Sequence, residues 1–285
     1  MRYLITGKSG QLARSFQQEL HRRTAQFLAP DESVFDITNR AAVFEAVGTY
    51  KPDVIINCAA YNLVDKAEQD RKKAFSVNAE GPGILAAAAE ENNSVLVHFG
   101  SDYVFDGAKE NGLYTEQDAV HPLNVYGESK REGERLVLEG TTKHIVFRLS
   151  WVFGEGKQNF IHKLSEWSQS NAFLKIACDE FSVPTSTHTV VDVTMQALEQ
   201  GLFGLYHLTN NGYCSRYEWA KHILAGLGIN QFVRPVSMDS FNLPALRPGF
   251  SAMSNELISR TLDISIPTWQ EAVTAFLHER NISHE

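Results

Sequence analysis

The sequence has few cysteines and no cysteine pattern typical of a metal site. Its three cysteines, Cys58, Cys178 and Cys214, are far apart and odd in number, and none forms a C-x-x-C pair. Such a set predicts neither a disulfide framework nor a zinc site. No metal-ligating residues are therefore predicted, and the use of a divalent metal stays open.

The sequence also lacks long apolar runs and an excess of positive charge. No stretch approaches the roughly 20 apolar residues that cross a bilayer, and the N-terminal apolar run is too short for a signal peptide. Acidic residues outnumber basic ones by 34 to 26, and the net charge of −8 argues against nucleic acid or an anionic membrane as the main partner. We therefore expect a cytoplasmic protein that binds a small molecule.

What the first half of the chain does contain is a regular alternation of strands and helices. Short strands, apolar on nearly every residue, are predicted at Tyr3–Thr6, Val54–Cys58, Val95–Phe99 and Ile145–Leu149, with a weaker one near Gln26–Ala29. Helices are predicted at Gln11–Arg23, Asn39–Tyr50, Asp70–Asn92 and Tyr126–Glu139. Strands of this kind are covered on both faces, and their alternation with helices is typical of a parallel sheet. The predicted fold is α/β, with a Rossmann-type doubly wound parallel sheet.

After Trp151 the pattern becomes less regular. A helix is predicted near Asn159–Ser170, and a helix over His188–Gln200 with a strand at Leu205–Leu208 indicates a return to the sheet. We therefore predict a dinucleotide-binding domain from residues 1–150 plus about 183–208. Residues of about 151–182 and 209–285 would form a smaller mixed C-terminal lobe for the substrate. Ligands of such sheets bind beyond the C-terminal strand ends.

The turn after the first strand, YLITGKSGQLA, contains Gly-Lys-Ser, the end of a P-loop. A P-loop needs a glycine five residues before Gly7, where this chain has Arg2, so that interpretation is rejected. Gly7, Gly10 and Ala13 instead fit a dinucleotide turn, in which the glycines allow a tight turn and close approach to a pyrophosphate. The helix N-terminus would face the phosphates. A plain strand-to-helix turn remains the alternative.

Tyr126 and Lys130, in NVYGESKREGE, are the candidate catalytic pair. Four residues apart, they share a helix face, and the lysine ammonium should lower the tyrosine pKa from about 10. The pair can then exchange a proton with a carbonyl oxygen while a hydride moves, and the lysine can hold a nicotinamide ribose. Tyr217 and Lys221 have the same spacing. The first pair is preferred because it follows a strand that ends at Ser101, whose hydroxyl could bind the same carbonyl.

Two further segments bear on the cofactor. The small residues 57–61 follow a predicted strand and would let a cofactor approach the backbone. Asp36, in FDITN, would either contact adenine or cap the next helix, and both interpretations stay open. The second strand ends in LAPDES, with neither an acidic residue at its end to select NAD nor a basic one to select NADP. The choice between NADH and NADPH therefore stays open.

Taken together, these segments resemble a known family. GKSGQLA, NCAAYNLVDKAE, SDYVFDG, PLNVYGESKREGE and FRLSWVFG occur in the order seen in dTDP-4-dehydrorhamnose reductases, which are extended short-chain dehydrogenase/reductases. The resemblance covers nearly the whole chain. It implies reduction of the 4-keto group of dTDP-4-dehydro-L-rhamnose by NADPH or NADH, giving dTDP-L-rhamnose. Reduction of another nucleotide-linked keto sugar, or a non-catalytic NAD(P)-binding regulatory role, are the alternatives.

The resemblance also assigns roles to residues. Tyr126 would be the proton donor, Lys130 would tune it and hold the ribose, and Ser101 would position the carbonyl. The cofactor would contact Tyr126, Lys130, Gly7, Gly10, Gln11, Leu12, Asp36, Ile37, Ala60, Tyr61 and Asn62. The substrate would contact Ser101, Asp102, Trp151 and Arg247. Trp151 would stack on the sugar unless it is a core aromatic, and Arg247 would bind the diphosphate unless it is a surface arginine.

The chain departs from the family pattern at several positions. Asn62 replaces a threonine, and Ser15 replaces a glutamate that helps some members bind magnesium at a dimer interface. A homodimer is therefore left open, but a metal-bridged one is in doubt. The segment DEFSVPT differs from D-Q-x-G-x-P-T at Glu180 and Ser182. A glutamate near a diphosphate would repel it, so this segment is expected to bind differently.

Overall fold

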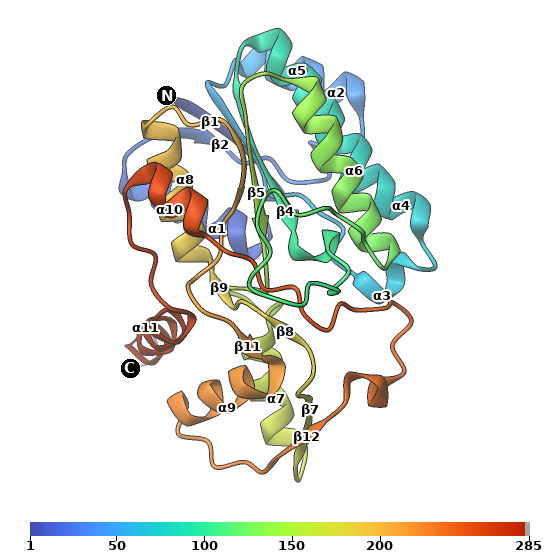
Figure 1. Cartoon of the computed structure of the whole chain (residues 1–285). Helices are drawn as coiled ribbons and strands as arrows, with labels where there is room; N and C mark the ends of the chain where they lie inside the picture. Colours follow the sequence, from blue (N-terminus) through green and yellow to red (C-terminus); the bar gives the residue numbers. More distant parts are fainter. Residues whose placement is uncertain (283–285) are drawn as a thin grey trace.

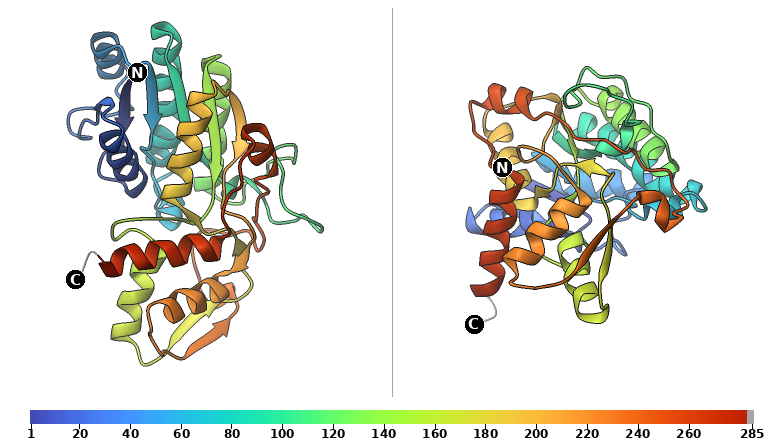
Figure 2. Two further views of the ribbon diagram at one scale, coloured as in Figure 1. Left: turned by 90° about the vertical axis from the view of Figure 1, so that its left-hand side faces the viewer. Right: turned by 60° about the horizontal axis from the view of Figure 1, so that its bottom comes forward.

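The computed structural model describes residues 1–282 and has two parts, an α/β domain and a smaller lobe beyond one end of its sheet (Figures 1 and 2). The central sheet has six parallel strands in the order β10-β5-β4-β3-β1-β2. Their bounds are β1 Arg2–Thr6, β2 Gln26–Leu28, β3 Val54–Asn57, β4 Val95–Ser101, β5 His144–Leu149 and β10 Gly204–His207. The predicted Rossmann-type parallel sheet is confirmed.

Helices cover both faces of this sheet (Figure 1). One face carries α2 (Arg40–Tyr50), α5 (Gly81–Asn92) and α6 (Val125–Gly140), with α3 (Val64–Ala67) and α4 (Arg71–Phe75) near its lower end. The other carries α1 (Gln11–Arg22), α8 (Thr187–Glu199) and α10 (Glu256–Leu262). Neighbouring strand residues point to opposite faces, so Leu4 and Ile5 of β1 enter two different cores. This explains why the strands are apolar at nearly every position.

The helix predicted over residues 70–92 is present, but its middle is irregular. A π-helical segment, η1 (Ser76–Glu80), joins α4 to α5. The Gly-Pro-Gly sequence does not interrupt the run, since Pro82 lies in the first turn of α5, where a proline is tolerated. The irregularity thus falls just before the proline.

The smaller lobe is built from short strand pairs and three helices. Its strands are β7 (Leu174–Ala177) with β12 (Val233–Val236), and β8 (Phe181–Ser182) with β11 (Cys214–Ser215). Its helices are α7 (Phe160–Ser170), α9 (Arg216–Gly226) and α11 (Trp269–Ile282). A further pair, β6 (Val152–Phe153) with β9 (Thr185–Ser186), lies where the chain passes between the parts. Trp219 is 1% exposed and belongs to the hydrophobic core of this lobe.

The chain crosses between the two parts several times. Strand β10 pairs with β5 in the central sheet, and residues of helix α8 pack in the core beside the sheet. Helix α10 was assigned to the smaller lobe, but its Ile258 and Leu262 pack in the same core as Ile5 of β1. We therefore propose a division in which α10 belongs with the sheet domain.

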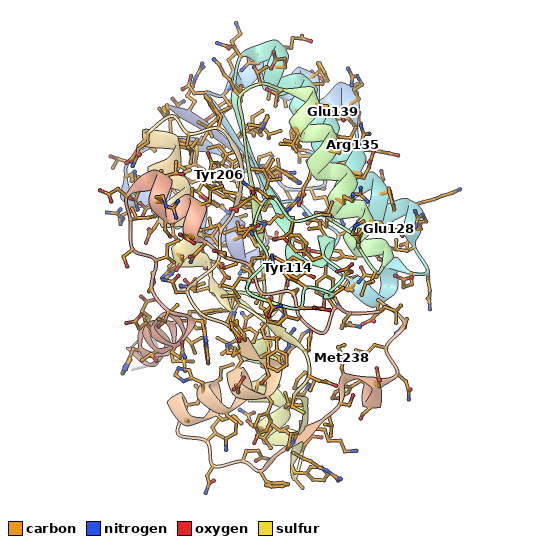
Figure 3. The ribbon with its side chains drawn as sticks, viewed as in Figure 1. Tyr114, Glu128, Arg135, Glu139, Tyr206 and Met238 are labelled. Atoms are coloured by element: carbon orange, nitrogen blue, oxygen red, sulfur yellow. The ribbon has the colours of Figure 1, made fainter. Side chains whose placement is uncertain are left out.

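The side chains of helix α6 divide between an outer face and a face that points into the sheet domain (Figure 3). On the outer face of α6, the exposed side chains of Arg135 and Glu139 form an ion pair. Arg135 also pairs with Glu132, which is half-buried. The opposite face of α6 buries Ser129, Lys130 and Glu134 against the sheet domain. Helix α6 therefore presents its functional candidates inward. No helix within residues 1–282 is both long and apolar enough to span a membrane.

Candidate active site

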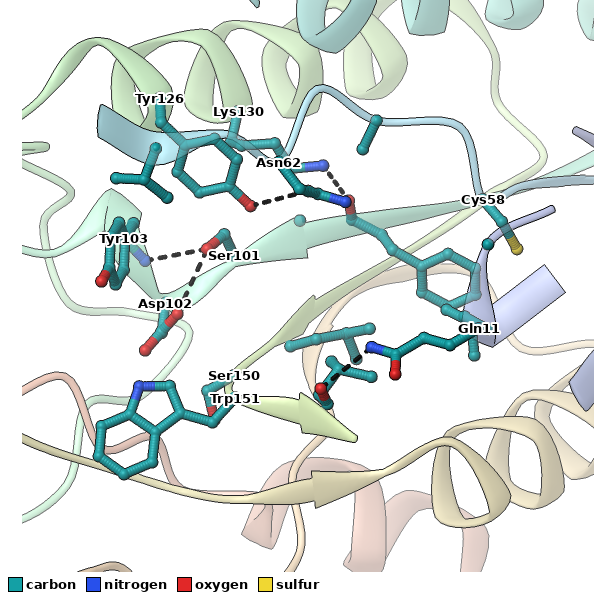
Figure 4. Close-up of a pocket in the computed structure, with 18 of the residues that line it drawn as sticks. Gln11, Cys58, Asn62, Ser101, Asp102, Tyr103, Tyr126, Lys130, Ser150 and Trp151 are labelled. Atoms are coloured by element: carbon teal, nitrogen blue, oxygen red, sulfur yellow. Dashed lines mark hydrogen bonds between the residues drawn. The ribbon is translucent and has the colours of Figure 1, made fainter. Parts of the chain in front are cut away.

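A pocket of about 320 Å³ lies beyond the C-terminal ends of β1, β3, β4 and β5 (Figure 4). The strand order reverses between β1 and β3, because β2 lies on one side of β1 and the later strands lie on the other side. This is the switch point where such sheets bind ligands. The pocket brings together ten of the predicted site residues, namely Gly10, Gln11, Leu12, Ala60, Asn62, Ser101, Asp102, Tyr126, Lys130 and Trp151. Their individual roles stay predictions.

The glycine turn closely approaches the segment that follows β3. Gly7 has a φ of +67°, and a Cβ there would lie 2.7 Å from the Ala59 nitrogen. Gly10 precedes α1, and no described side chain caps that helix. The first N–H groups of α1 can therefore serve an anion at the pocket, as in dinucleotide sites. From the first turn of this helix, Gln11 Nε2 donates to the Val152 carbonyl at 3.0 Å.

Lys130 is buried and bonded to the backbone. Its Nζ donates to the Phe99 carbonyl at 2.5 Å. Burial lowers the Lys130 pKa to about 8, against the opposing effect of Glu134. The lysine lines the pocket from α6 and reaches the last residues of β4.

Tyr126 is partly exposed to the pocket, and its hydroxyl donates to Asn62 Oδ1 at 3.5 Å. Burial raises its pKa to about 12, while the Ser101 hydroxyl lowers it and Asp102 raises it. Burial therefore outweighs any lowering of this pKa by Lys130, whose ammonium donates to the Phe99 carbonyl, and the role of Lys130 toward Tyr126 stays a prediction. A phenol with this pKa is protonated at neutral pH and can donate a proton.

Ser101 is the last residue of β4, and its side chain faces the pocket beside Asp102 (Figure 4). Its Oγ accepts a hydrogen bond from the Tyr103 amide at 3.2 Å and donates to Asp102 Oδ1 at 3.3 Å. Asp102 is 3% exposed, and burial raises its pKa to about 6. The strand end thus offers a hydroxyl group backed by a buried carboxyl group.

Trp151 lies between this pocket and the smaller lobe. Its φ of +37° is unusual for a residue with a side chain. The indole stacks on Trp219 with ring centroids 5.5 Å apart, and the Arg216 guanidinium lies 3.6 Å from the Trp151 ring centroid. Glu180, whose charge was expected to repel a diphosphate, forms an ion pair with Arg216 at 3.2 Å. Its charge is therefore balanced inside the protein.

Arg247 does not line this pocket. It lies 14% exposed and forms a bidentate ion pair with Asp65, at 2.7 and 3.0 Å. Its guanidinium borders a second pocket of about 370 Å³ in the smaller lobe. That pocket also contains Phe160, Lys163, Trp167, Lys175, Glu180 and Arg216. Arg247 is therefore not a free surface arginine, and its contact with a diphosphate stays a prediction.

The remaining cofactor candidates lie outside the first pocket. Asp36 accepts hydrogen bonds from the Thr38 amide and hydroxyl, whereas Asn39 is the residue that caps α2. The interpretation of Asp36 as the helix cap is therefore wrong, and its contact with adenine stays a prediction. Ile37 packs in the core, where a Cβ on Gly81 would touch it. The Tyr61 side chain is buried.

Sequence reasoning missed the residue that fixes the loop after β3. Asn78, in the π-helical segment, accepts from the Tyr61 amide at 2.8 Å and donates to the Tyr61 carbonyl and to Ser129 Oγ, both at 3.0 Å. It thereby joins the loop holding Ala60 and Asn62 to helix α6. An asparagine in the middle of a predicted helix was the available signal, because such a residue favours caps and turns.

Ser15 replaces a possible metal ligand and is engaged internally. Its Oγ lies within hydrogen-bond distance of the Gln11 carbonyl oxygen, at 3.2 Å, and of Thr187 Oγ1, at 2.8 Å. Among residues 1–282, no group of three or more histidine, cysteine or acidic side chains could hold a metal ion.

The sheet order and the glycine turn at its switch point define a Rossmann-type dinucleotide-binding protein. The family model for the RmlD substrate binding domain matches residues 1–282. The chain is 37% identical to a dTDP-4-dehydrorhamnose reductase from Aggregatibacter actinomycetemcomitans, over 95% of this chain and 97% of the relative. It belongs to the dTDP-4-dehydrorhamnose reductase family, as its motifs predicted.

Solved structures agree with this family. The dTDP-4-dehydrorhamnose reductase of Clostridium acetobutylicum superposes with a TM-score of 0.95 at 34% identity, over 99% of this chain and all (100%) of that one. The Bacillus anthracis reductase, solved in complex with NADP, gives 0.94 at 33% identity, over 98% of this chain and 99% of that one. A Thermus thermophilus UDP-glucose 4-epimerase, at 17% identity and a TM-score of 0.83 over 98% of both chains, shares the fold.

Proposed function

We propose that this protein reduces the 4-keto group of dTDP-4-dehydro-L-rhamnose with NADPH or NADH and produces dTDP-L-rhamnose. The observation that carries the proposal is the convergence of Tyr126, Ser101 and Lys130 on the pocket that also contains the glycine turn. A relative with this named activity is 37% identical, and another was solved with NADP. The tight turn at Gly7, which packs against the backbone of Cys58 and Ala59, and the start of α1 at the pocket support binding of a dinucleotide there.

The chemistry divides between cofactor and protein. When bound, the nicotinamide supplies a hydride to the carbonyl carbon. Tyr126 donates the proton that the carbonyl oxygen needs, and its raised pKa keeps it protonated at neutral pH. Ser101 would hydrogen-bond the same oxygen, and Lys130, which donates to the Phe99 carbonyl, would hold the ribose. Hydride and proton together convert the ketone into an alcohol.

The second pocket is suited to the nucleoside diphosphate of the substrate. Lys163 and Lys175 border it with Arg216 and Arg247, which are paired with Glu180 and Asp65, so basic side chains outnumber acidic ones along its lining. Basic side chains favour a diphosphate. Phe160 and Trp167 add aromatic rings that can pack on a base. Trp151 lies between the two pockets and would contact the sugar. The sugar's ketone would then reach the Tyr126 hydroxyl.

Two other functions are weighed against this proposal. Reduction of another nucleotide-linked keto sugar would use the same catalytic residues, and Glu180 and Ser182 in the substrate lobe favour it. A non-catalytic regulatory subunit would need no proton donor, so the presence of Tyr126 and Ser101 in one pocket argues against it. We further propose a cytoplasmic protein with a small-molecule substrate and no nucleic-acid partner, and a homodimer remains an open proposal.

The test is loss of reduced-nicotinamide absorbance when the protein meets dTDP-4-dehydro-L-rhamnose, with NADH and NADPH in parallel. We expect oxidation of the cofactor and dTDP-L-rhamnose as product. Tyr126→Phe should bind cofactor normally and lose about 10²- to 10⁴-fold in turnover. Tyr217→Phe, which alters the second tyrosine-lysine pair, should keep the chemical step intact. Full activity of Tyr126→Phe would overturn the catalytic assignment, and tight cofactor binding without turnover would favour the alternatives.

A further inference from the structure

The buried carboxylate of Asp102 is held by hydroxyl groups from the smaller lobe. Ser182, in β8, donates to Asp102 Oδ2 at 2.8 Å, and Ser251 donates to the same oxygen at 2.6 Å. Both serines are almost completely buried, at 0% and 2% exposure. Asp102 itself belongs to the sheet domain, directly after β4. This carboxylate therefore joins the two parts of the molecule.

The backbone fixes both serines in place. The Phe181 amide donates to the Gly249 carbonyl at 2.8 Å, and the Ser251 amide donates to the Phe181 carbonyl at 2.9 Å. These two bonds hold residues 249–251 beside β8. The two hydroxyl groups consequently converge on one oxygen atom, and neither needs to move to reach it.

Ser101 is left with the other oxygen of the same carboxylate. Its hydroxyl lies 3.3 Å from Asp102 Oδ1, a longer contact than the two from the smaller lobe. A buried carboxylate needs hydrogen-bond donors, and here two other serines supply the short ones. A serine hydroxyl has only one proton to give. Its weak bond to Asp102 leaves that proton available for a substrate carbonyl.

We propose that Ser182 and Ser251 are positioning residues, which satisfy Asp102 from the smaller lobe and thereby release the Ser101 hydroxyl to bind the reacting carbonyl. This inference rests on the proposed reductase function. Without the two serines, Asp102 would take its donor from Ser101 and withdraw that proton from the substrate. The activity of the site in the sheet domain therefore depends on contact with the smaller lobe.

The surroundings of Asp102 decide how this should depend on pH. Tyr103 follows it in the 3₁₀ turn η2 (Asp102–Val104), Tyr126 faces it from α6, and Glu180 lies just before β8, paired with Arg216 of α9. Burial raises the pKa of Asp102, and the serine hydroxyls oppose that rise. Removing either serine should therefore raise this pKa further. Once protonated, Asp102 no longer competes strongly for the Ser101 proton.

The experiment compares Ser182→Ala, Ser251→Ala and the double variant with Ser94→Ala. Ser94 is a matched control, equally buried at 1% and bonded to the Pro52 carbonyl at 2.6 Å, but it precedes β4 at the far end of that strand. At pH 8 we expect kcat of the double variant to fall about tenfold with unchanged cofactor binding. The deficit should shrink as the pH falls toward 5.5. Ser94→Ala should keep the wild-type kcat and pH profile.

A second readout needs no turnover. Carboxyl-carbon NMR should give a higher pKa for Asp102 in Ser182→Ala and in Ser251→Ala, and an unchanged one in Ser94→Ala. An unchanged Asp102 pKa, or a kcat deficit that is the same at every pH, would overturn the positioning role. Failure of the wild-type protein to reduce the substrate would instead overturn the proposed function, and the NMR result would still stand on its own.

Discussion

His207 is held neutral inside the protein by two opposed hydrogen bonds. Its Nδ1 contacts the Tyr114 carbonyl at 3.2 Å, and its Nε2 lies 3.4 Å from the Arg148 guanidinium. A guanidinium only donates, so Nε2 is the acceptor and Nδ1 carries the proton. Burial, with the nearby Arg148, lowers the His207 pKa from 6.5 to about 3. Protonation would place two cations side by side.

This residue should make the protein less stable in mild acid. The unfolded chain binds a proton at His207 below pH 6.5 while the folded chain does not until about pH 3, so stability falls as the pH drops through that window. Between pH 6.5 and 5 the loss is about 2 kcal/mol for this one group. Denaturant titrations at pH 7 and 5 should show that the free energy of unfolding falls by about 2 kcal/mol less in His207→Gln than in the wild type.

The matched variant is His121→Gln, because His121 is exposed to solvent. It should keep the wild-type difference between the two pH values. Equal pH dependence in His207→Gln and the wild type would contradict the assigned neutral state of His207.

At the scale of elements, helix α6 lies in direct contact with the π-helical segment. A Cβ on Gly133 would stand 2.0 Å from the Asn78 carbonyl oxygen, so only a glycine allows this approach. The approach also sets the distance between α6, which carries Tyr126 and Lys130, and the loop that Asn78 holds. Packing of two helices thus decides where the catalytic pair meets the cofactor loop.

Gly133→Ala should therefore destabilise the fold by about 1–3 kcal/mol. Gly48→Ala is its control, because Gly48 lies within helix α2 and a Cβ added there would have no atom within 4 Å. That change should stabilise the protein by roughly 0.5–1 kcal/mol, since alanine favours helix more than glycine does. Thermal unfolding of both variants checks the pair. A Gly133→Ala variant as stable as Gly48→Ala would show that α6 can shift without cost.

At the scale of the whole molecule, residues 245–247 connect the smaller lobe to the sheet domain through hydrogen bonds. Asp65, in α3, accepts from the Ala245 amide at 3.2 Å as well as from Arg247. Asn124, which caps α6, donates to the Leu246 carbonyl at 2.7 Å. Met238 begins the 3₁₀ turn that precedes this segment and borders the second pocket (Figure 3).

Asp65→Asn should loosen this tie while the fold persists. Hydrogen exchange of the Ala245 amide should quicken by about tenfold, because the ion pair that holds Arg247 in place is lost. Glu128→Gln is the control, since it breaks the exposed pair of Glu128 with Arg71, whose partners both belong to the sheet domain. Its Ala245 exchange should match the wild type. Unchanged exchange in Asp65→Asn would mean that Asn124 alone secures the segment.

Local patterns were sufficient to predict the sheet domain. Strand β3 was expected at Val54–Cys58 and ends at Asn57, and α1 was expected at Gln11–Arg23 and ends at Arg22. These elements are recognisable because burial on both faces makes a strand continuously apolar, a property of neighbouring residues. The glycine turn and the tyrosine–lysine spacing are local signals too, and both lead to the same pocket.

Only the tertiary structure decided which partners the site residues take. Lys130 binds the Phe99 carbonyl, Asp102 receives hydroxyl groups from residues 80 and 149 positions away, and Arg247 pairs with Asp65 across 182 positions. The first contact depends on how α6 packs against β4, and the others depend on how the smaller lobe docks on the sheet. No periodicity within a single element encodes either kind of packing. The sequence by itself determined the sheet, its glycine turn and the family. Packing between elements and docking of the lobe determined how the groups within the site are buried and paired, because both depend on contacts between residues far apart in the chain.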